Sequence, residues 1–129
     1  MKAGRRVLVL AVLVLLASAG LAWHAEPGAD DKDFVPAAQL DVPPVPRSAP
    51  ELSRLEGVRL SGLPLRLRLF IDTSGRVVEV RVLSGREDEA VLAAVRAMFE
   101  ATAFVPGHRA GTVVAAFTDI ELALNPAEP

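Results

Sequence analysis

Apolar and polar residues alternate along two stretches in the middle of the chain, and a short polar turn separates them. The apolar positions are Leu65, Leu67, Leu69 and Ile71 in the first stretch, and Val78, Val80 and Val82 in the second. Successive side chains of a β-strand point to opposite faces, so the pattern predicts a hairpin with one buried and one solvent-facing side. The turn, Asp-Thr-Ser-Gly at 72–75, places glycine where a positive φ is needed, and we expect Asp72 to accept hydrogen bonds from turn amides.

An amphipathic helix is predicted after the hairpin. Ser84 and Glu87 have the spacing of a capping box, and the acidic run 87–89 suits the positive end of a helix dipole. The apolar positions that follow fall on one helical face: Val91, Val95, Met98, Phe99 and Thr102. Pro106 disfavours helix at the residue before it, so the helix is expected to end before Phe104.

A final alternating strand is predicted over 112–124, after a loop at 107–111. One face carries Val114, Ala116, Thr118, Ile120, Leu122 and Leu124, and the other carries Val113, Ala115, Phe117, Asp119, Glu121 and Ala123. The acids of the second face are expected opposite arginines of the hairpin. Together with a short helical turn near Glu51, these elements predict one small α+β domain over residues 51–129.

The first 24 residues read as a membrane anchor or a signal peptide. Lys2, Arg5 and Arg6 precede an uncharged run from Val7 to Trp23, and acids follow it, which orients the rest of the chain for export. The anchor interpretation is a single-pass inner-membrane helix with these positions in the bilayer: Val7, Leu10, Leu13, Leu16, Ser18 and Trp23. The alternative is cleavage near Ala19, which would leave a soluble periplasmic protein. Both interpretations remain open on sequence alone.

Residues 25–50 are rich in proline and are expected to form a spacer without a fold of its own. Six prolines interrupt any helix or strand there: Pro27, Pro36, Pro43, Pro44, Pro46 and Pro50. Extended polyproline geometry would give the spacer a reach of about 80 Å.

Composition excludes several classes of function. The net charge of −2 offers no basic field for nucleic acid, and the absence of cysteine removes disulfides, thiolate chemistry and cysteine-based zinc sites. His24 and His108 lie far apart in the sequence and have no carboxylates at metal-ligand spacing. We expect no catalytic residues, no metal site and no cofactor, and interpret His108 as a solvated loop residue.

Four segments in this order resemble the C-terminal domain of the TonB family. They are Leu67–Val77, Val80–Gly85, Phe104–Pro106 and Gly111–Val114, and the resemblance covers about residues 56–124. It implies a two-layer ββαβ domain, in which three strands form an antiparallel or mixed sheet and the helix packs on one face.

The resemblance also implies a function in the periplasm of Gram-negative bacteria. TonB domains grip a short peptide, the TonB box, of an outer-membrane transporter, while the anchor meets an inner-membrane motor of the ExbB and ExbD kind. If the first hairpin strand is central, the last strand lies at an edge, where an extended peptide can add itself. The predicted partner-binding residues are Thr112, Val113, Ala115, Phe117, Asp119 and Glu121. A homodimer through this edge is an alternative partner.

A second function stays open because the anchor departs from the family pattern. Ser18 is the one candidate for the family's polar positions at membrane depth, since His24 lies beyond Trp23. The alternative is therefore an exported peptide-binding or self-associating module of the same fold, without energy coupling.

Overall fold

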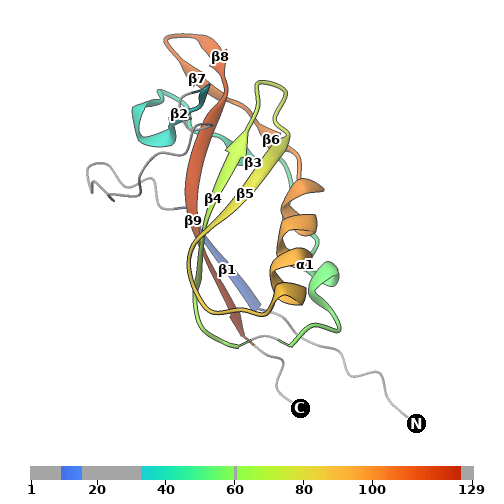
Figure 1. Ribbon diagram of the computed structural model, residues 1–129. Coiled ribbons are helices and arrows are strands. Elements are labelled where there is room, and N and C mark those ends of the chain that lie inside the picture. Colours follow the sequence, from blue (N-terminus) through green and yellow to red (C-terminus); the bar gives the residue numbers. More distant parts are fainter. Residues whose placement is uncertain (1–9, 16–32, 60, 126–129) are drawn as a thin grey trace.

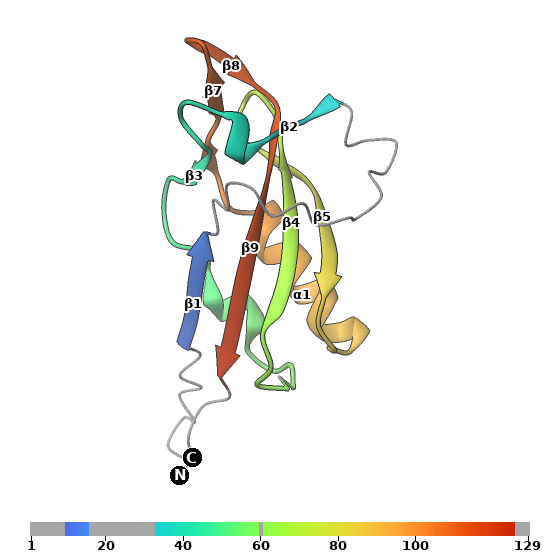
Figure 2. The ribbon, with the colours of Figure 1, turned by 90° about the vertical axis from the view of Figure 1, so that its left-hand side faces the viewer.

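The computed structural model describes residues 10–15, 33–59 and 61–125. Its centre is a sheet in the order β1-β9-β4-β5 (Figures 1 and 2). The four strands are β1 (Leu10–Leu15), β9 (Ala116–Asn125), β4 (Leu65–Ile71) and β5 (Val77–Ser84). β4 pairs antiparallel with both β5 and β9, so the predicted hairpin and the predicted final strand share one sheet with β4 between them. The α+β class is confirmed.

The expectation of a three-stranded sheet with the last strand at its edge is wrong. β1 pairs antiparallel with β9 on the side away from β4, and the short β2 (Val35–Pro36) pairs with β9 in the parallel direction. The sheet is therefore mixed, with four strands along its main path and β2 added beside β9. The physical reason is that a bare strand edge exposes unpaired N–H and C=O groups, which nearby extended segments can satisfy.

One face of the sheet and one face of helix α1 (Glu89–Glu100) make the hydrophobic core (Figure 1). The sheet contributes buried side chains at the predicted alternating positions, among them Leu65, Leu67, Leu69, Ile71, Ile120 and Leu122. The helix contributes Val91, Val95, Met98 and Phe99, and Thr102 is buried just after it. The predicted core faces of β4 and α1 are confirmed, and that of the last strand is confirmed from Ala116 to Leu122, whereas Val114 belongs to β8 and is half-buried.

A bulge in β5 corrects the predicted position of Val78. Ile71 pairs with Val77 and Phe70 pairs with Glu79, so Val78 has no partner across the β4–β5 ladder. This extra residue turns Val77 inward, where it is 6% exposed, and leaves Val78 51% exposed. Strict alternation therefore holds for Val80 but not for the start of this strand.

The predicted capping box at Ser84 and Glu87 does not form. Ser84 ends β5, and α1 begins after Asp88, whose side chain makes no capping hydrogen bond. The carboxylate of Glu87 instead accepts hydrogen bonds from the amide of Ser61 at 3.3 Å and from its hydroxyl at 2.6 Å. A partner distant in sequence has replaced the local one.

The turn between β4 and β5 is organised by Asp72, as predicted. Its carboxylate accepts hydrogen bonds from the amide and hydroxyl of Ser74 and from the amide of Arg76, at 2.6–3.0 Å. Partial burial alone would raise the pKa of Asp72, but these hydrogen bonds and the Arg76 charge outweigh it and lower that pKa. Gly75 completes the turn at φ +88°. Asp72 is thus a structural turn residue.

The proline-rich segment is not a free spacer over the part that the structure describes. Beyond β2 it forms the short 3-10 helix η2 (Ala37–Gln39) and strand β3 (Val45–Pro46), which pairs antiparallel with β6 (Phe104–Val105). Backbone hydrogen bonds join Val35 to Ala115 at 2.9 Å and Arg47 to Ala103 at 2.9 Å. Proline cannot donate a hydrogen bond, but the residues beside the prolines can, and they find acceptors at the exposed backbone of the domain.

A second hairpin replaces the loop predicted at 107–111. Strands β7 (Gly107–Arg109) and β8 (Thr112–Val114) pair antiparallel around Ala110 and Gly111, both at positive φ. The backbone of His108 bonds to Val42 in both directions, at 2.9 and 3.2 Å. His108 is therefore a strand residue, not the solvated loop residue expected, and its Nδ1 is buried without a hydrogen-bond partner within the described ranges.

The 3-10 helix η3 (Leu52–Leu55) lies beside α1 and buries Leu55, which agrees with the helical turn expected near Glu51. Gly57 follows at φ +85°.

The candidate anchor segment contains a strand where a helix was expected. Leu10 and Leu13 belong to β1, whereas Val7, Leu16, Ser18 and Trp23 lie outside the described residues. A six-residue apolar run does not distinguish helix from strand by periodicity, and here its backbone pairs with β9. Among the described residues no helix is long and apolar enough to cross a membrane.

Candidate functional site: the outer edge of β9

The side of β9 that faces away from β4, called the outer edge here, is paired by two separate segments. β1 runs antiparallel along Ile120–Asn125, with Val14 opposite Glu121 and Val12 opposite Ala123. β2 runs parallel, with Val35 opposite Ala116 and Pro36 opposite Phe117. Figure 2 shows β1 beside the lower part of β9 and β2 near its upper end. The edge thus pairs with strands of either direction.

The backbone groups that serve this edge belong to the odd-numbered residues of β9. The carbonyl of Ala115 accepts the hydrogen bond from Val35 on the outer side. Because the backbone N–H and C=O of a strand residue point the same way and alternate along the strand, those of Phe117, Asp119, Glu121 and Ala123 also point outward. Asp119 lies between the two pairings and has no strand residue opposite it on this side in the described part of the chain.

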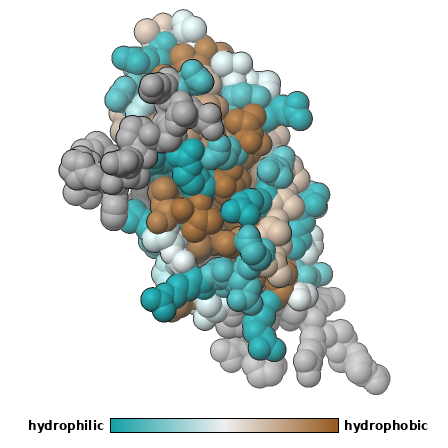
Figure 3. All heavy atoms as spheres, viewed as in Figure 1, coloured by the Kyte–Doolittle hydropathy of each residue, from teal (hydrophilic) through white to brown (hydrophobic). Residues whose placement is uncertain are grey.

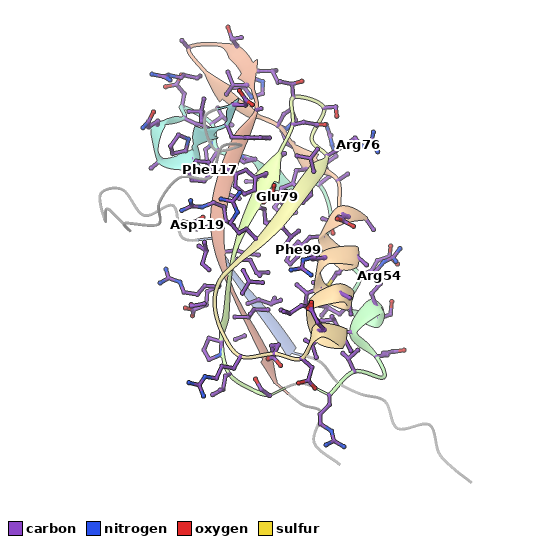
Figure 4. All side chains as sticks on the ribbon, in the orientation of Figure 1. Arg54, Arg76, Glu79, Phe99, Phe117 and Asp119 are labelled. Atoms are coloured by element: carbon purple, nitrogen blue, oxygen red, sulfur yellow. The ribbon has the colours of Figure 1, made fainter. Side chains whose placement is uncertain are left out.

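The structure brings only some of the predicted partner-binding residues together. Phe117, Asp119 and Glu121 follow one another on the face of β9 away from α1, as predicted. Figure 4 shows Phe117 and Asp119 on β9. Thr112 and Val113 belong to β8 instead, where Arg109 and His108 of β7 are their partners. Ala115 separates β8 from β9 and contributes its carbonyl.

The helix-free face of the sheet beside this edge carries an aromatic cluster. Phe70 and Phe117 are cross-strand neighbours on β4 and β9, with ring centroids 5.8 Å apart. Phe34, just before β2, meets Phe70 edge-on at 5.1 Å and 77°. Phe70 is 0% exposed although α1 packs against the opposite face of the sheet. Figure 3 shows apolar surface near the middle of the face in view, with hydrophilic side chains beside it.

Two arginines are held over these rings by acids. Arg68 donates to both carboxylate oxygens of Asp119, at 2.7 and 3.0 Å, and its guanidinium lies 4.3 Å from the Phe117 ring centroid. Arg81 donates to Glu79 at 2.9 Å and lies 4.7 Å from the Phe70 ring centroid. A bidentate pair fixes the plane of a guanidinium, so the Asp119 contact also orients Arg68 over Phe117. The predicted pairing of acids and arginines across strands is confirmed for Arg68 and Asp119.

Phe34 and Phe70 are the residues of this region that the sequence analysis missed. Alternation along β4 puts Phe70 on the solvent-facing side with Arg66 and Arg68, where a large aromatic residue is unexpected. Phe117 has the same parity on β9, so the pair was detectable as two aromatic residues on an otherwise charged face. Nothing local signalled Phe34, because its contact depends on the docking of the proline-rich segment.

Three comparisons with known proteins add no relative. No family model matches the chain, and neither the curated proteins nor the solved structures contain a significant match. Within the described ranges, no three histidine, aspartate or glutamate residues are grouped so that they could hold a metal ion. The candidate site is therefore a backbone edge flanked by an aromatic and charged face.

Proposed function

We propose that this protein is a TonB-like module, exported to the periplasm, that binds an extended peptide of an outer-membrane transporter along the outer edge of β9. The observation that carries this proposal is the pairing of two different segments, β1 and β2, with that edge. A surface that takes two unrelated sequences in opposite directions recognises backbone more than side chains, as expected for strand addition.

The edge has the length and chemistry that this binding mode needs. β9 spans Ala116–Asn125, contains no proline and can offer an outward donor at every second residue. Each main-chain hydrogen bond contributes about 1 kcal/mol net, so several are needed for useful affinity. Phe117, Asp119 and Glu121 add one aromatic and two acidic side chains beside the bound backbone.

Occupation by β1 and anchoring in a membrane exclude each other. Leu10–Leu15 lies inside the uncharged run Val7 to Trp23, and one segment cannot be both a bilayer helix and a strand of this sheet. Insertion of the run into a membrane, or its removal by cleavage, frees the edge at Ile120–Asn125 for a partner.

In this proposal, only the membrane-anchored form of the protein couples peptide binding to an inner-membrane motor. A second candidate function, peptide binding without coupling, is favoured by one observation. The uncharged run contains no ionisable side chain, and His24 follows Trp23, so the segment has no proton-sensitive group at membrane depth.

A proline at Ala123 tests the proposal. The outward backbone of Ala123 faces Val12 in the β1 pairing, so Ala123→Pro removes one donor at the outer edge and spares the ladder with β4. Ala123→Val is the matched control, because it also enlarges the side chain but keeps the N–H. We expect the full chain in phospholipid vesicles to capture outer-membrane transporters, and Ala123→Pro to reduce that capture about tenfold relative to Ala123→Val.

Arg96→Ala, on α1, serves as the distant control and is expected to leave capture unchanged. Circular dichroism of each variant confirms that it is folded. Equal capture by the folded proline and valine variants would contradict binding at this edge.

A further inference from the structure

The aromatic cluster has a form that the sheet alone does not require. A helix-free sheet face normally carries polar side chains, yet Phe70 is completely buried there. Its ring contacts Phe117 at 5.8 Å, lies under the guanidinium of Arg81 at 4.7 Å and meets Phe34 edge-on at 5.1 Å. The first two belong to the sheet, whereas Phe34 comes from the proline-rich segment and lies next to β2. Without Phe34, the sheet presents a site for an aromatic ring.

The walls of this site are fixed independently of Phe34. Asp119 holds Arg68 over Phe117, and Glu79 holds Arg81 over Phe70. These ion pairs and cation–π contacts join residues of β4, β5 and β9 only. A ring that enters meets the edge of Phe70 without rearrangement of the strands, which lowers the entropic cost of binding.

The strand that holds Phe34 against the sheet is short enough for a partner peptide to displace it. β2 has two residues, and the backbone bond from Val35 to Ala115, at 2.9 Å, ties it to the outer edge. Phe34 and Pro36 are two positions apart, so both side chains lie on the helix-free face, where Pro36 is opposite Phe117. The segment Phe34-Val35-Pro36 therefore lies along β9 as a short parallel strand, with the side chain of Phe34 against Phe70.

We propose that Phe34-Val35-Pro36 occupies the position of a partner peptide that runs parallel to β9 and packs an aromatic side chain against Phe70, in the place of Phe34. This inference rests on the proposed function, and it adds a direction and a specificity-determining residue to it. The partner's aromatic residue takes the position of Phe34, and the residues after it continue along the outward backbone of Phe117, Asp119 and Glu121. A partner bound in this way displaces β2 and β1 together.

The experiment uses the full chain and a fluorescent peptide with the sequence of residues 33–38, Asp-Phe-Val-Pro-Ala-Ala. In the wild type the peptide competes with the internal copy, which lowers its apparent affinity by the fraction of molecules whose site is free. Phe34→Ala empties the ring site, so we expect this variant to bind the peptide about tenfold or more tightly than the wild type. The same peptide with alanine in place of phenylalanine should show no such gain.

A pocket variant completes the design. Phe70→Leu in the Phe34→Ala background keeps an apolar residue but removes the ring, and it should abolish the gain while the protein stays folded by circular dichroism. Equal affinity of wild type and Phe34→Ala, or equal binding of the two peptides, would overturn the inference. If that happens while Ala123→Pro still lowers transporter capture relative to Ala123→Val, the edge binds peptides and only the aromatic site is wrong.

Discussion

Gly75→Ala is expected to destabilise the domain by about 3 kcal/mol or more. Gly75 has φ +88°, and a Cβ built there would lie 2.0 Å from the carbonyl oxygen of Phe104 and 3.0 Å from its carbon. Both atoms are backbone, and the carbonyl of Gly75 also accepts the amide of Phe104 at 2.9 Å. The left-handed conformation and the clash therefore add, because no side-chain rotation can relieve either. Urea unfolding of the two proteins measures the difference.

Gly111→Ala is the matched control for this substitution. Gly111 also lies in a hairpin turn at positive φ, +79°, but a Cβ added there would meet no atom within 4 Å, so only the conformational cost of about 1–2 kcal/mol remains. If Gly75→Ala and Gly111→Ala lower the free energy of unfolding by the same amount, Gly75 does not lie as close to the backbone of Phe104 as described.

Phe99→Ala is the second substitution with a large expected effect, a loss of about 3–5 kcal/mol in the free energy of unfolding. Phe99 is 0% exposed and lies between α1 and the sheet (Figure 4). Removing its ring leaves a cavity in the core cluster that α1 shares with the sheet, and close packing there limits collapse around it. A small domain has a total stability of only about 5–15 kcal/mol, so this variant should be close to unfolding.

Val78→Ala tests, in the same unfolding assay, whether Val78 is buried, as strict alternation predicts, or exposed. Strict alternation places Val78 in the core, whereas the bulge leaves it 51% exposed. We therefore expect a change within about 0.5 kcal/mol. A loss above about 1 kcal/mol would instead support the unbulged register.

The elements that could be predicted from the sequence are those whose pattern is local. The alternation of β4 and β9 and the helical face of α1 each reflect burial against one partner surface, so periodicity identified them. The bulge at Val78 left no local sign, because it depends on how β5 pairs with β4. Glu87 was misassigned for a related reason: Ser61, distant in the sequence, outcompetes the local capping contact.

The candidate site, too, could be predicted only in part. Alternation along β9 places Phe117, Asp119 and Glu121 on one face, and alternation along β4 places Phe70 on the same face of the sheet. The occupants of the outer edge were not predictable, because β1 and β2 come from segments whose compositions indicate a membrane run and a spacer. Their pairing depends on an unpaired backbone edge that exists only once β9 has joined β4.

Photo-crosslinking from Glu121 in cells of a Gram-negative host tests the central claim most directly. A photoreactive amino acid replaces Glu121, whose backbone points to the outer edge of β9, and a second variant carries it at Val78, exposed on β5 at the opposite edge of the sheet. We predict crosslinks from position 121 to one extended segment of an outer-membrane transporter, and none to that segment from position 78. Crosslinks from position 121 confined to the protein's own residues 10–15, or transporter crosslinks from position 78 alone, would contradict peptide binding at the outer edge of β9.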